Sequence, residues 1–218
     1  MNPSTETADN CPQCAKPPAL CICDRVEAVD TRLRVVILQH PQEDDALLGT
    51  ARLVTLTLPR AEIRIGLSWP SLAGALGVPR AAHERWAVLA VTKLPEAVLA
   101  VAQREQVALV DRHGALLDRR KHRLEGILVL DGSWSQAKTL WWRNPWLLKL
   151  PRLALVPREP SMYGRLRREP RRDRVSTLEA IADALPALGE PEAARDSLRR
   201  LLRTLLQRAR DAREPPAG

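Results

Sequence analysis

Short apolar runs bounded by turn residues recur along the chain and predict buried β-strands. A run of about four to eight apolar residues between such boundaries is typical of a strand inside a core. The runs cover residues 33–38, 61–65, 86–91, 107–110, 127–130 and 153–156. The run at 61–65 is the weakest of the six, because charged residues interrupt it.

Helical patterns lie between and after these runs. Residues 46–58 predict a short helix that Pro59 stops, whereas the Pro- and Gly-rich stretch 68–81 predicts a loop. Two helices are expected near the end of the chain, over about 176–188 and 191–213. In the second, leucines recur at i, i+3, i+4, i+7 and i+8, which gives a stripe that faces the core. Strands that alternate with helices favour an α/β domain with a parallel or mostly parallel sheet.

The run at 127–130 ends in Asp-Gly-Ser-Trp (131–134), where a strand passes directly into a helix. In open α/β sheets, ligands bind in the crevice outside the carboxyl ends of the strands. Ser133 and Gln136 have the spacing of a capping box, in which two side chains satisfy free groups at a helix start. This structural explanation does not account for an acid at a strand end or for the adjacent Trp. Asp131 is therefore a candidate general base or a group that orients a ligand.

Two further segments carry candidate chemistry. Ser176 and Glu179 form a second capping box, and the amides of a helix start can also hold a carboxylate or a phosphate. His40 and Glu43 follow the first predicted strand in the sequence His-Pro-Gln-Glu. A His at a strand end is more often a structural group than a catalyst. Structural and functional roles both stay open for the two segments.

All four cysteines fall within thirteen residues. Short spacers allow four thiolates to converge tetrahedrally on one ion at about 2.3 Å, and four sulfur ligands leave no open position. The sequence therefore predicts a structural zinc ion held by Cys11, Cys14, Cys21 and Cys23. A redox pair or a reduced, metal-free cluster are the alternatives, and the Cys-x-Cys half is tighter than the usual two-residue spacer.

The charge of the chain points to a polyanionic partner. The formal net charge is +8 and the isoelectric point about 10.0, which favours phosphate neutralisation and counterion release. Residues 158–174 hold seven Arg against three acids. We expect a nucleic-acid surface there, and a solvated loop in an arginine-rich protein is the plain alternative.

Several protein classes lack support in the sequence. There is no Gly-rich nucleotide fingerprint, no Gly-x-Ser-x-Gly and no His-Glu-x-x-His, so dehydrogenases, kinases and hydrolases are not indicated. No segment approaches the roughly 20 apolar residues of a membrane span. Residues 1–10 lack the apolar core of a signal peptide. We therefore expect a soluble, cytoplasmic protein without a membrane partner.

Taken together, these motifs resemble the DTW-domain family, the tRNA-uridine aminocarboxypropyltransferases. Asp-Gly-Ser-Trp at 131–134 is similar to its naming motif Asp-x-Thr-Trp, and the cysteine cluster resembles its N-terminal signature. His-Pro-x-Glu at 40–43 with Thr-Ala-Arg at 50–52 resembles its first-strand motif. Leu-Arg-x-x-Pro at 166–170, followed by Ser-Thr-Leu-Glu-Ala at 176–180, resembles its C-terminal motif. The set spans most of the chain in the expected order.

Two positions depart from the pattern of the family. Ser133 replaces the motif Thr, which keeps the hydroxyl and loses a methyl group. Gly49 stands where an Asn is expected before Thr50. Neither change removes the acid of the naming motif.

The resemblance implies a SPOUT-like α/β fold with a C-terminal knot. It divides the chain into a zinc-binding knuckle with its tail at 1–25 and a DTW catalytic domain at 30–218. It implies S-adenosylmethionine as donor of a 3-amino-3-carboxypropyl group to the imide nitrogen of a tRNA uridine, with release of methylthioadenosine. The implied partner is tRNA, without an obligate protein partner, and the chain is expected as a monomer or a homodimer.

The resemblance also implies roles for individual residues. Asp131 is the catalytic residue, which accepts or orients the proton of the uridine imide. The donor is expected to contact Thr92, Leu130, Gly132, Ser133, Trp134, Ser176, Thr177 and Glu179. The RNA is expected to contact His40, Glu43, Arg52, Tyr163, Arg165, Arg167, Arg168, Arg171 and Arg172.

Three other functions compete with this interpretation. The same group could be transferred to ribosomal RNA, or the chain could be a SPOUT-type RNA methyltransferase. A non-catalytic, zinc-containing RNA-binding protein is a different class. The acid at a strand end argues against that class, because a binding module has no need of it.

Overall fold

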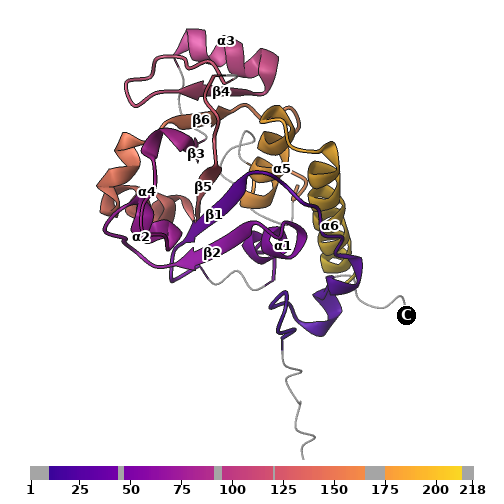
Figure 1. Cartoon of the computed structure of the whole chain (residues 1–218). Helices are drawn as coiled ribbons and strands as arrows, with labels where there is room; N and C mark the ends of the chain where they lie inside the picture. The colour runs from indigo at the N-terminus through magenta and orange to yellow at the C-terminus, as the bar shows by residue number, and fades with distance from the viewer. Residues whose placement is uncertain (1–9, 44–46, 91–94, 120, 165–174, 213–218) are drawn as a thin grey trace, which may run out of the picture.

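A single six-stranded sheet, in the order β2-β1-β5-β3-β6-β4, organises the protein (Figure 1). The structure is a computed structural model that describes residues 10–43, 47–90, 95–119, 121–164 and 175–212. The strands are β1 (Arg34–Gln39), β2 (Ala61–Ile65), β3 (Trp86–Ala90), β4 (Val107–Val110), β5 (Gly126–Asp131) and β6 (Arg152–Leu155). Neighbouring strands run parallel except β4, which is antiparallel to β6. The six predicted strands and the mostly parallel sheet are thereby confirmed.

Helices surround the sheet and connect its strands. The α-helices are α1 (Ala51–Thr57), α2 (Leu72–Leu76), α3 (Glu96–Glu105), α4 (Trp134–Arg143), α5 (Thr177–Ala187) and α6 (Glu192–Asp211). The short 3-10 helices are η1 (Pro18–Leu20), η2 (Cys23–Arg25), η3 (His83–Arg85) and η4 (Pro145–Lys149). Within the described ranges, no helix combines the length and apolar character needed to cross a lipid bilayer.

Helices α2 and α3 both differ from what the sequence pattern predicted. The stretch 68–81 was expected as a loop, yet it contains α2, because the Ser71 hydroxyl accepts a hydrogen bond from the Gly74 amide and caps the helix. Gly77, at φ +63°, ends it in the left-handed conformation that glycine adopts without strain. Helix α3, after Pro95, was not predicted at all.

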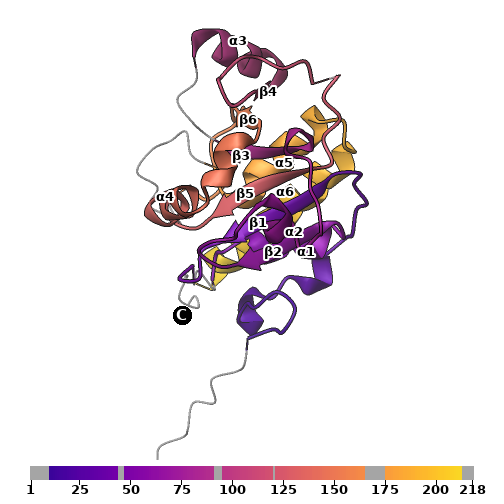
Figure 2. The same ribbon diagram turned by 60° about the vertical axis from the view of Figure 1, so that its left-hand side comes forward.

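Alternate residues of each strand face two helical layers. Val35 and Ile37 of β1 pack in a core with α1, α5 and α6, whereas Val36 and Leu38 pack with α2 and the α4–η4 segment. Figures 1 and 2 show α4 and α5 on opposite sides of the sheet. Helix α3 covers β4 and β6 through a smaller cluster around Val98 and Ala102. Burial on both faces explains why the strands appear in the sequence as almost continuous apolar runs.

The N-terminal segment packs on the same core as α6. Leu20 and Ile22 are buried in the cluster that holds the leucine stripe of α6. Arg208 forms an ion pair with Asp24 at 3.0 Å. The proposed division of the chain at residues 25–30, the SPOUT-like class and the knot stay predictions.

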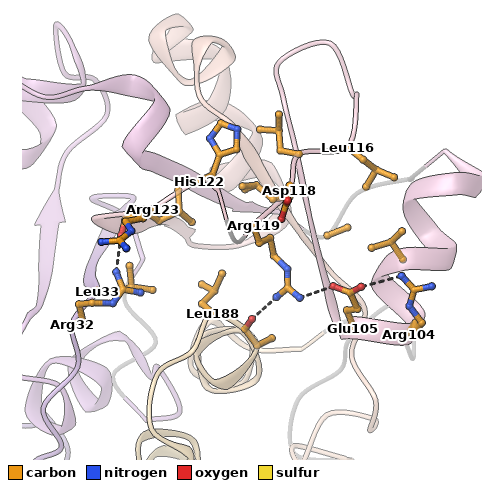
Figure 3. Close-up of a pocket in the computed structure, with 16 residues that line it drawn as sticks. Arg32, Leu33, Arg104, Glu105, Leu116, Asp118, Arg119, His122, Arg123 and Leu188 are labelled. Carbon is orange, nitrogen blue, oxygen red and sulfur yellow. Dashed lines mark hydrogen bonds and ion pairs between the residues drawn. The ribbon is translucent and has the colours of Figure 1, made fainter.

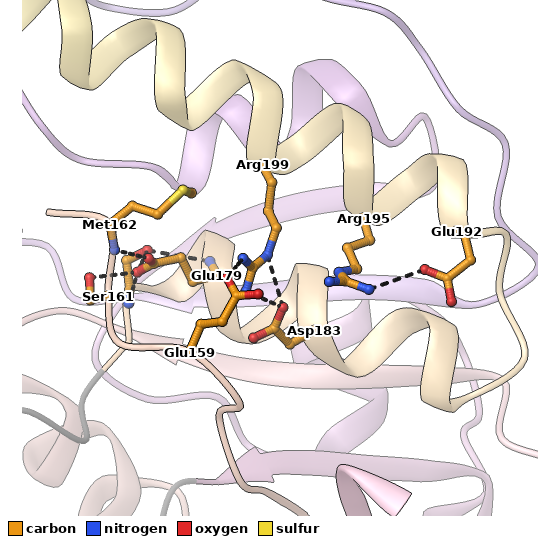
Figure 4. Close-up of polar contacts among 9 residues, drawn as sticks. Glu159, Ser161, Met162, Glu179, Asp183, Glu192, Arg195 and Arg199 are labelled. Carbon is orange, nitrogen blue, oxygen red and sulfur yellow. Dashed lines mark hydrogen bonds and ion pairs between the residues drawn. The ribbon is translucent and has the colours of Figure 1, made fainter.

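Helices α5 and α6 are joined by a buried ion pair (Figure 4). Arg199 of α6 donates to Asp183 of α5 at 2.7 Å and to Glu159 at 2.6 Å. Burial raises the pKa of Asp183, and the hydrogen bonds from Arg199 oppose that shift. The pair fixes α5 against α6, and the start of α5 reaches the carboxyl edge of the sheet.

Candidate active site

Asp131 lies at the carboxyl end of β5 and is bound by residues from two other elements. Its side chain is on the α5 side of the sheet, beside its register partner Gln39 on β1. Gln39 Nε2 donates to Asp131 Oδ2 at 2.7 Å, and the Thr177 hydroxyl of α5 donates to Oδ1. Asp131 is 9% exposed. The carboxylate therefore cross-links β1, β5 and α5 at the edge where open α/β sheets bind ligands.

These contacts favour an orienting role for Asp131 over the role of a general base. A general base needs a free lone pair within reach of the proton that it removes. Each oxygen of Asp131 already accepts one hydrogen bond, and the side chain is only 9% exposed, so a substrate has little access to the remaining lone pairs. An acceptor that holds Gln39 and Thr177 in place fits this geometry better than a base.

Both expected capping boxes are present at the same edge. Ser133 accepts from the Gln136 amide while the Gln136 side chain accepts from the Ser133 amide at 2.6 Å. At α5, Ser176 and Glu179 make the equivalent pair of contacts. The starts of α4 and α5 thus face the carboxyl edge from the two sides of the sheet.

Gly132 connects β5 to α4 with a backbone that an L side chain rarely adopts, at φ +145°. A Cβ at this position would lie 2.9 Å from atoms of Gln136 and 3.4 Å from His40. The glycine therefore allows the strand end, the α4 cap and the loop after β1 to approach one another closely.

The other site residues on this edge differ in exposure. His40 is buried, its amide donates to the Asp131 carbonyl at 3.0 Å, and its Nδ1 accepts from the Gln42 amide at 3.1 Å. Trp134 is 65% exposed at the start of α4. Leu130 and Glu43 are half-buried, and Arg52 is exposed on α1. The structure thus brings His40 and Asp131 together and leaves Trp134 open to a ligand.

Two residues expected at the site have contacts that fit structural roles. Tyr163 is 2% exposed, and its hydroxyl donates to the Leu48 carbonyl at 2.7 Å, which leaves little of it for RNA. The Glu179 carboxylate, also 2% exposed, accepts from the Ser161 and Ser176 hydroxyls and from the Met162 amide (Figure 4). A carboxylate so fully occupied inside the protein is not available to bind a donor.

Several expected contacts cannot be placed. The residues concerned lie outside the described part of the chain: Thr92, Arg165, Arg167, Arg168, Arg171 and Arg172.

The four cysteines meet in one cluster, as their spacing predicted. Their sulfur atoms all lie within 4.8 Å of one another, with Cys11 to Cys23 at 3.7 Å and Cys14 to Cys21 at 3.8 Å. A tetrahedral ion with bonds of about 2.3 Å sets its sulfur ligands about 3.8 Å apart, so the cluster fits zinc. Backbone N–H groups of Cys14 and Gln13 lower the pKa of Cys11, whereas burial raises the pKa of Cys23.

The cysteine segment also contacts the loop before α1. Lys16 is 2% exposed, and its ammonium group donates to the Gly49 carbonyl at 2.7 Å. The neighbouring Leu48 carbonyl accepts the bond from Tyr163. The knuckle and the core thus hold this loop from two directions, and it is the loop in which Gly49 departs from the family motif.

A separate cavity of about 1160 Å³ opens at the opposite edge of the sheet (Figure 3). Arg32 and Leu33 precede β1 and Arg123 precedes β5, so the cavity lies at the amino ends of these strands. Arg119 crosses it, bound to Glu105 at 2.6 Å and to the Ala187 carbonyl. Among the residues that the structure describes, none of those expected to bind the donor or RNA lines this cavity.

Gln39 belongs to the site but was not predicted from the sequence. Its amide completes the contacts of Asp131, and the residue is the last of β1. The only available signal was its position, because two neighbouring parallel strands place their final residues side by side. Finding it required knowledge that β1 and β5 are neighbours, although 92 positions separate the two residues.

Comparison with known proteins gives consistent matches. A family model described as DTW domain matches residues 8–210. Three relatives are named tRNA-uridine aminocarboxypropyltransferase 2. The Mus musculus protein is 26% identical over 204 residues, which cover 92% of this chain and 63% of that protein. The Drosophila melanogaster protein is 28% identical over 205 residues, 90% of this chain and 73% of that protein.

The third relative, from Macaca fascicularis, is 25% identical over 197 residues, 89% of this chain and 61% of that protein. This chain therefore spans a little over six-tenths of the length of the two mammalian proteins. No solved structure matches it.

Proposed function

The chain belongs to the DTW domain family, and on that premise we propose that it transfers the 3-amino-3-carboxypropyl group of S-adenosylmethionine to the imide nitrogen of a tRNA uridine. The observation that carries the proposal is the position of the family's motif acid. Asp131 and its partners stand at the carboxyl edge of a parallel sheet, between the starts of two helices. The relatives named above support the choice of reaction.

The reaction needs little acid–base catalysis. The uridine imide passes its proton to solvent, and the nitrogen attacks the methylene carbon beside the positive sulfur. The new carbon–nitrogen bond forms as the carbon–sulfur bond breaks, and its electron pair neutralises the sulfur. Methylthioadenosine leaves without a charge, so no general acid is required. Positioning of the two reactants can supply about 7–11 kcal/mol of the barrier at best.

We assign Asp131 to positioning, for an electrostatic reason as well as a geometric one. The positive charge on sulfur disappears in the transition state, so a carboxylate beside it favours the bound donor and not the transition state. Asp131 instead holds the Gln39 amide and the Thr177 hydroxyl. The oxygen of Thr177 keeps its lone pairs, with which it can accept a hydrogen bond from the donor or from uridine.

The two helix starts are not equivalent as sites for the donor carboxylate. Amides at a helix start attract anions, and a carboxylate already bound there repels a second one. The start of α5 carries the buried Glu179, whereas α4 is capped by the neutral Gln136. We therefore place the donor carboxylate at Ser133 and the start of α4, next to the exposed Trp134.

The remaining parts of the proposal follow the family. Zinc at the four cysteines is structural, because four sulfur ligands leave no position for a substrate. The arginines between Arg165 and Arg172 contact tRNA phosphates. Arg52, His40 and Glu43 contact other parts of the RNA near the carboxyl edge. The SPOUT-like class belongs to the same proposal, and the mostly parallel sheet with helices on both faces supports it.

A labelled donor tests this function. Purified protein is incubated with unmodified tRNA, or separately with ribosomal RNA, and with S-adenosylmethionine labelled either in the aminocarboxypropyl arm or in the methyl group. We expect label in tRNA only from the arm, with methylthioadenosine as the second product. Label from the methyl group would identify a methyltransferase. Label in ribosomal RNA alone would show that ribosomal RNA, and not tRNA, is the acceptor.

A further inference from the structure

Helix α4 presents two tryptophans to solvent on one face. Trp134 is 65% exposed and Trp142 is 70% exposed, and the exposed Lys138 stands midway between them. Residues four apart lie on the same face of a helix, so the three side chains form one row. Leu140, on the opposite side of α4, is fully buried. Trp141, beside the row, is half-buried and packs against the core that holds α2.

This row lies in a segment with charges of one sign. From residue 132 to residue 158 the chain has five Lys or Arg and no Asp or Glu. Lys138, Arg143 and Lys149 are exposed, at the middle of α4, at its end and in η4. Aromatic side chains interleaved with cations are typical of surfaces that bind single-stranded nucleic acid.

We propose that the row Trp134–Lys138–Trp142 is a stacking platform for unpaired bases of the RNA substrate, with Lys138 bound to the phosphate between them. The rise of about 1.5 Å per residue sets the two tryptophans about 12 Å apart along the helix. They therefore contact different nucleotides and do not enclose one base. The row begins at Trp134 of the Asp-Gly-Ser-Trp motif. Nucleotides stacked on it would therefore lie next to the nucleotide in the candidate active site.

Other occupants fit the row less well. Lys is depleted at the centre of protein–protein interfaces, and here it separates the two aromatic side chains. A helix that lies in a membrane surface uses a long apolar face, but the apolar face of this ten-residue helix is turned inward. The inference rests on the proposed function for the identity of the RNA as tRNA.

The test is the affinity of the full-length protein for an unmodified tRNA, measured without S-adenosylmethionine at several salt concentrations. Trp142→Ala is expected to weaken binding about 5- to 150-fold, the effect of losing one stacked base. Trp142→Phe keeps an aromatic face and restores most of the affinity, whereas Trp142→Leu does not. Lys138→Ala lowers the slope of log affinity against log salt by about 0.7, and Trp142→Ala leaves that slope unchanged.

Exposed residues of similar character, one apolar and one cationic, lie elsewhere on the surface and serve as controls. Leu116→Ala removes an exposed apolar side chain and Lys121→Ala an exposed cation, and both variants should bind tRNA like the wild type. Equal affinity of Trp142→Ala and the wild type would overturn the inference. So would a Trp142→Ala variant that changes self-association or vesicle binding but not tRNA affinity.

The assay separates this inference from the proposed function, because it contains no donor. If the protein binds tRNA through Trp142 but transfers no group, the proposed reaction is wrong and the proposed stacking platform is supported. If the protein transfers the group and Trp142→Ala binds tRNA as well as the wild type, the proposed reaction is supported and the stacking platform is wrong.

Discussion

Asp131→Ala is expected to lower the rate of group transfer at least about 100-fold, because a small misplacement of reacting groups costs about that much. The substitution removes the acceptor that holds Gln39 and Thr177 at the carboxyl edge. Two half-buried donors lose a charged acceptor, so we also expect a loss of about 1.5–3 kcal/mol in the free energy of unfolding. Single-turnover transfer and urea unfolding measure the two effects.

Asp131→Asn distinguishes a positioning group from a base. The Asn carbonyl can accept from Gln39 and its amide can donate to the Thr177 hydroxyl, so both contacts survive without the charge. We expect this variant to keep most of the wild-type rate. A general base would be lost in Asn and Ala alike, so equally slow Asn and Ala variants would contradict the positioning role. Gln39→Leu removes one contact only and should give an intermediate rate.

Cys14→Ser is expected to remove a bound zinc ion and to unfold the segment around the cysteines. Structural zinc in small fingers contributes about 10–16 kcal/mol of apparent binding free energy, so its loss exceeds what a short segment can replace. Cys14 is 1% exposed, and the cluster packs beside Leu20 on the core. Metal analysis and limited proteolysis of residues 10–25 measure the change.

The zinc cluster should also affect transfer, through Lys16. Without the metal, Lys16 is no longer held against the Gly49 carbonyl, and the loop before α1 loses one of its anchors. Lys16→Met is the matched control, because it breaks this contact and spares all four cysteines. We expect the Lys16→Met variant to contain as much zinc as the wild type and to transfer the group more slowly. Wild-type protein purified without chelator that contained no zinc would contradict the metal site.

The sequence predicted the sheet well because its strands are buried on both faces. Such strands appear as local apolar runs, and a local pattern needs no knowledge of the partner strand. Helix α2 was missed because Pro and Gly dominate the composition around it, although Ser71 and Gly77 supply its two caps. Asp131 could be found because an acid at a strand end stands out against the apolar run before it.

The role of Asp131 could not be found in the same way. Its contacts depend on strand register and on the docking of α5, and these bring Gln39 and Thr177 from distant parts of the chain. A similar limit applies to Glu179, since a capping box looks the same in a sequence whether or not its acid is buried. Tyr163 stood beside an arginine-rich stretch in the sequence, yet its side chain packs inward.

The location of the donor tests the account most directly. A crystal structure of the protein with S-adenosylmethionine, or with the product methylthioadenosine, would show which edge of the sheet binds it. We expect the ligand at the carboxyl edge, between the starts of α4 and α5, with Trp134 and Thr177 among its contacts. A ligand in the cavity lined by Arg32 and Arg119 at the amino edge, with the carboxyl edge empty, would contradict the account.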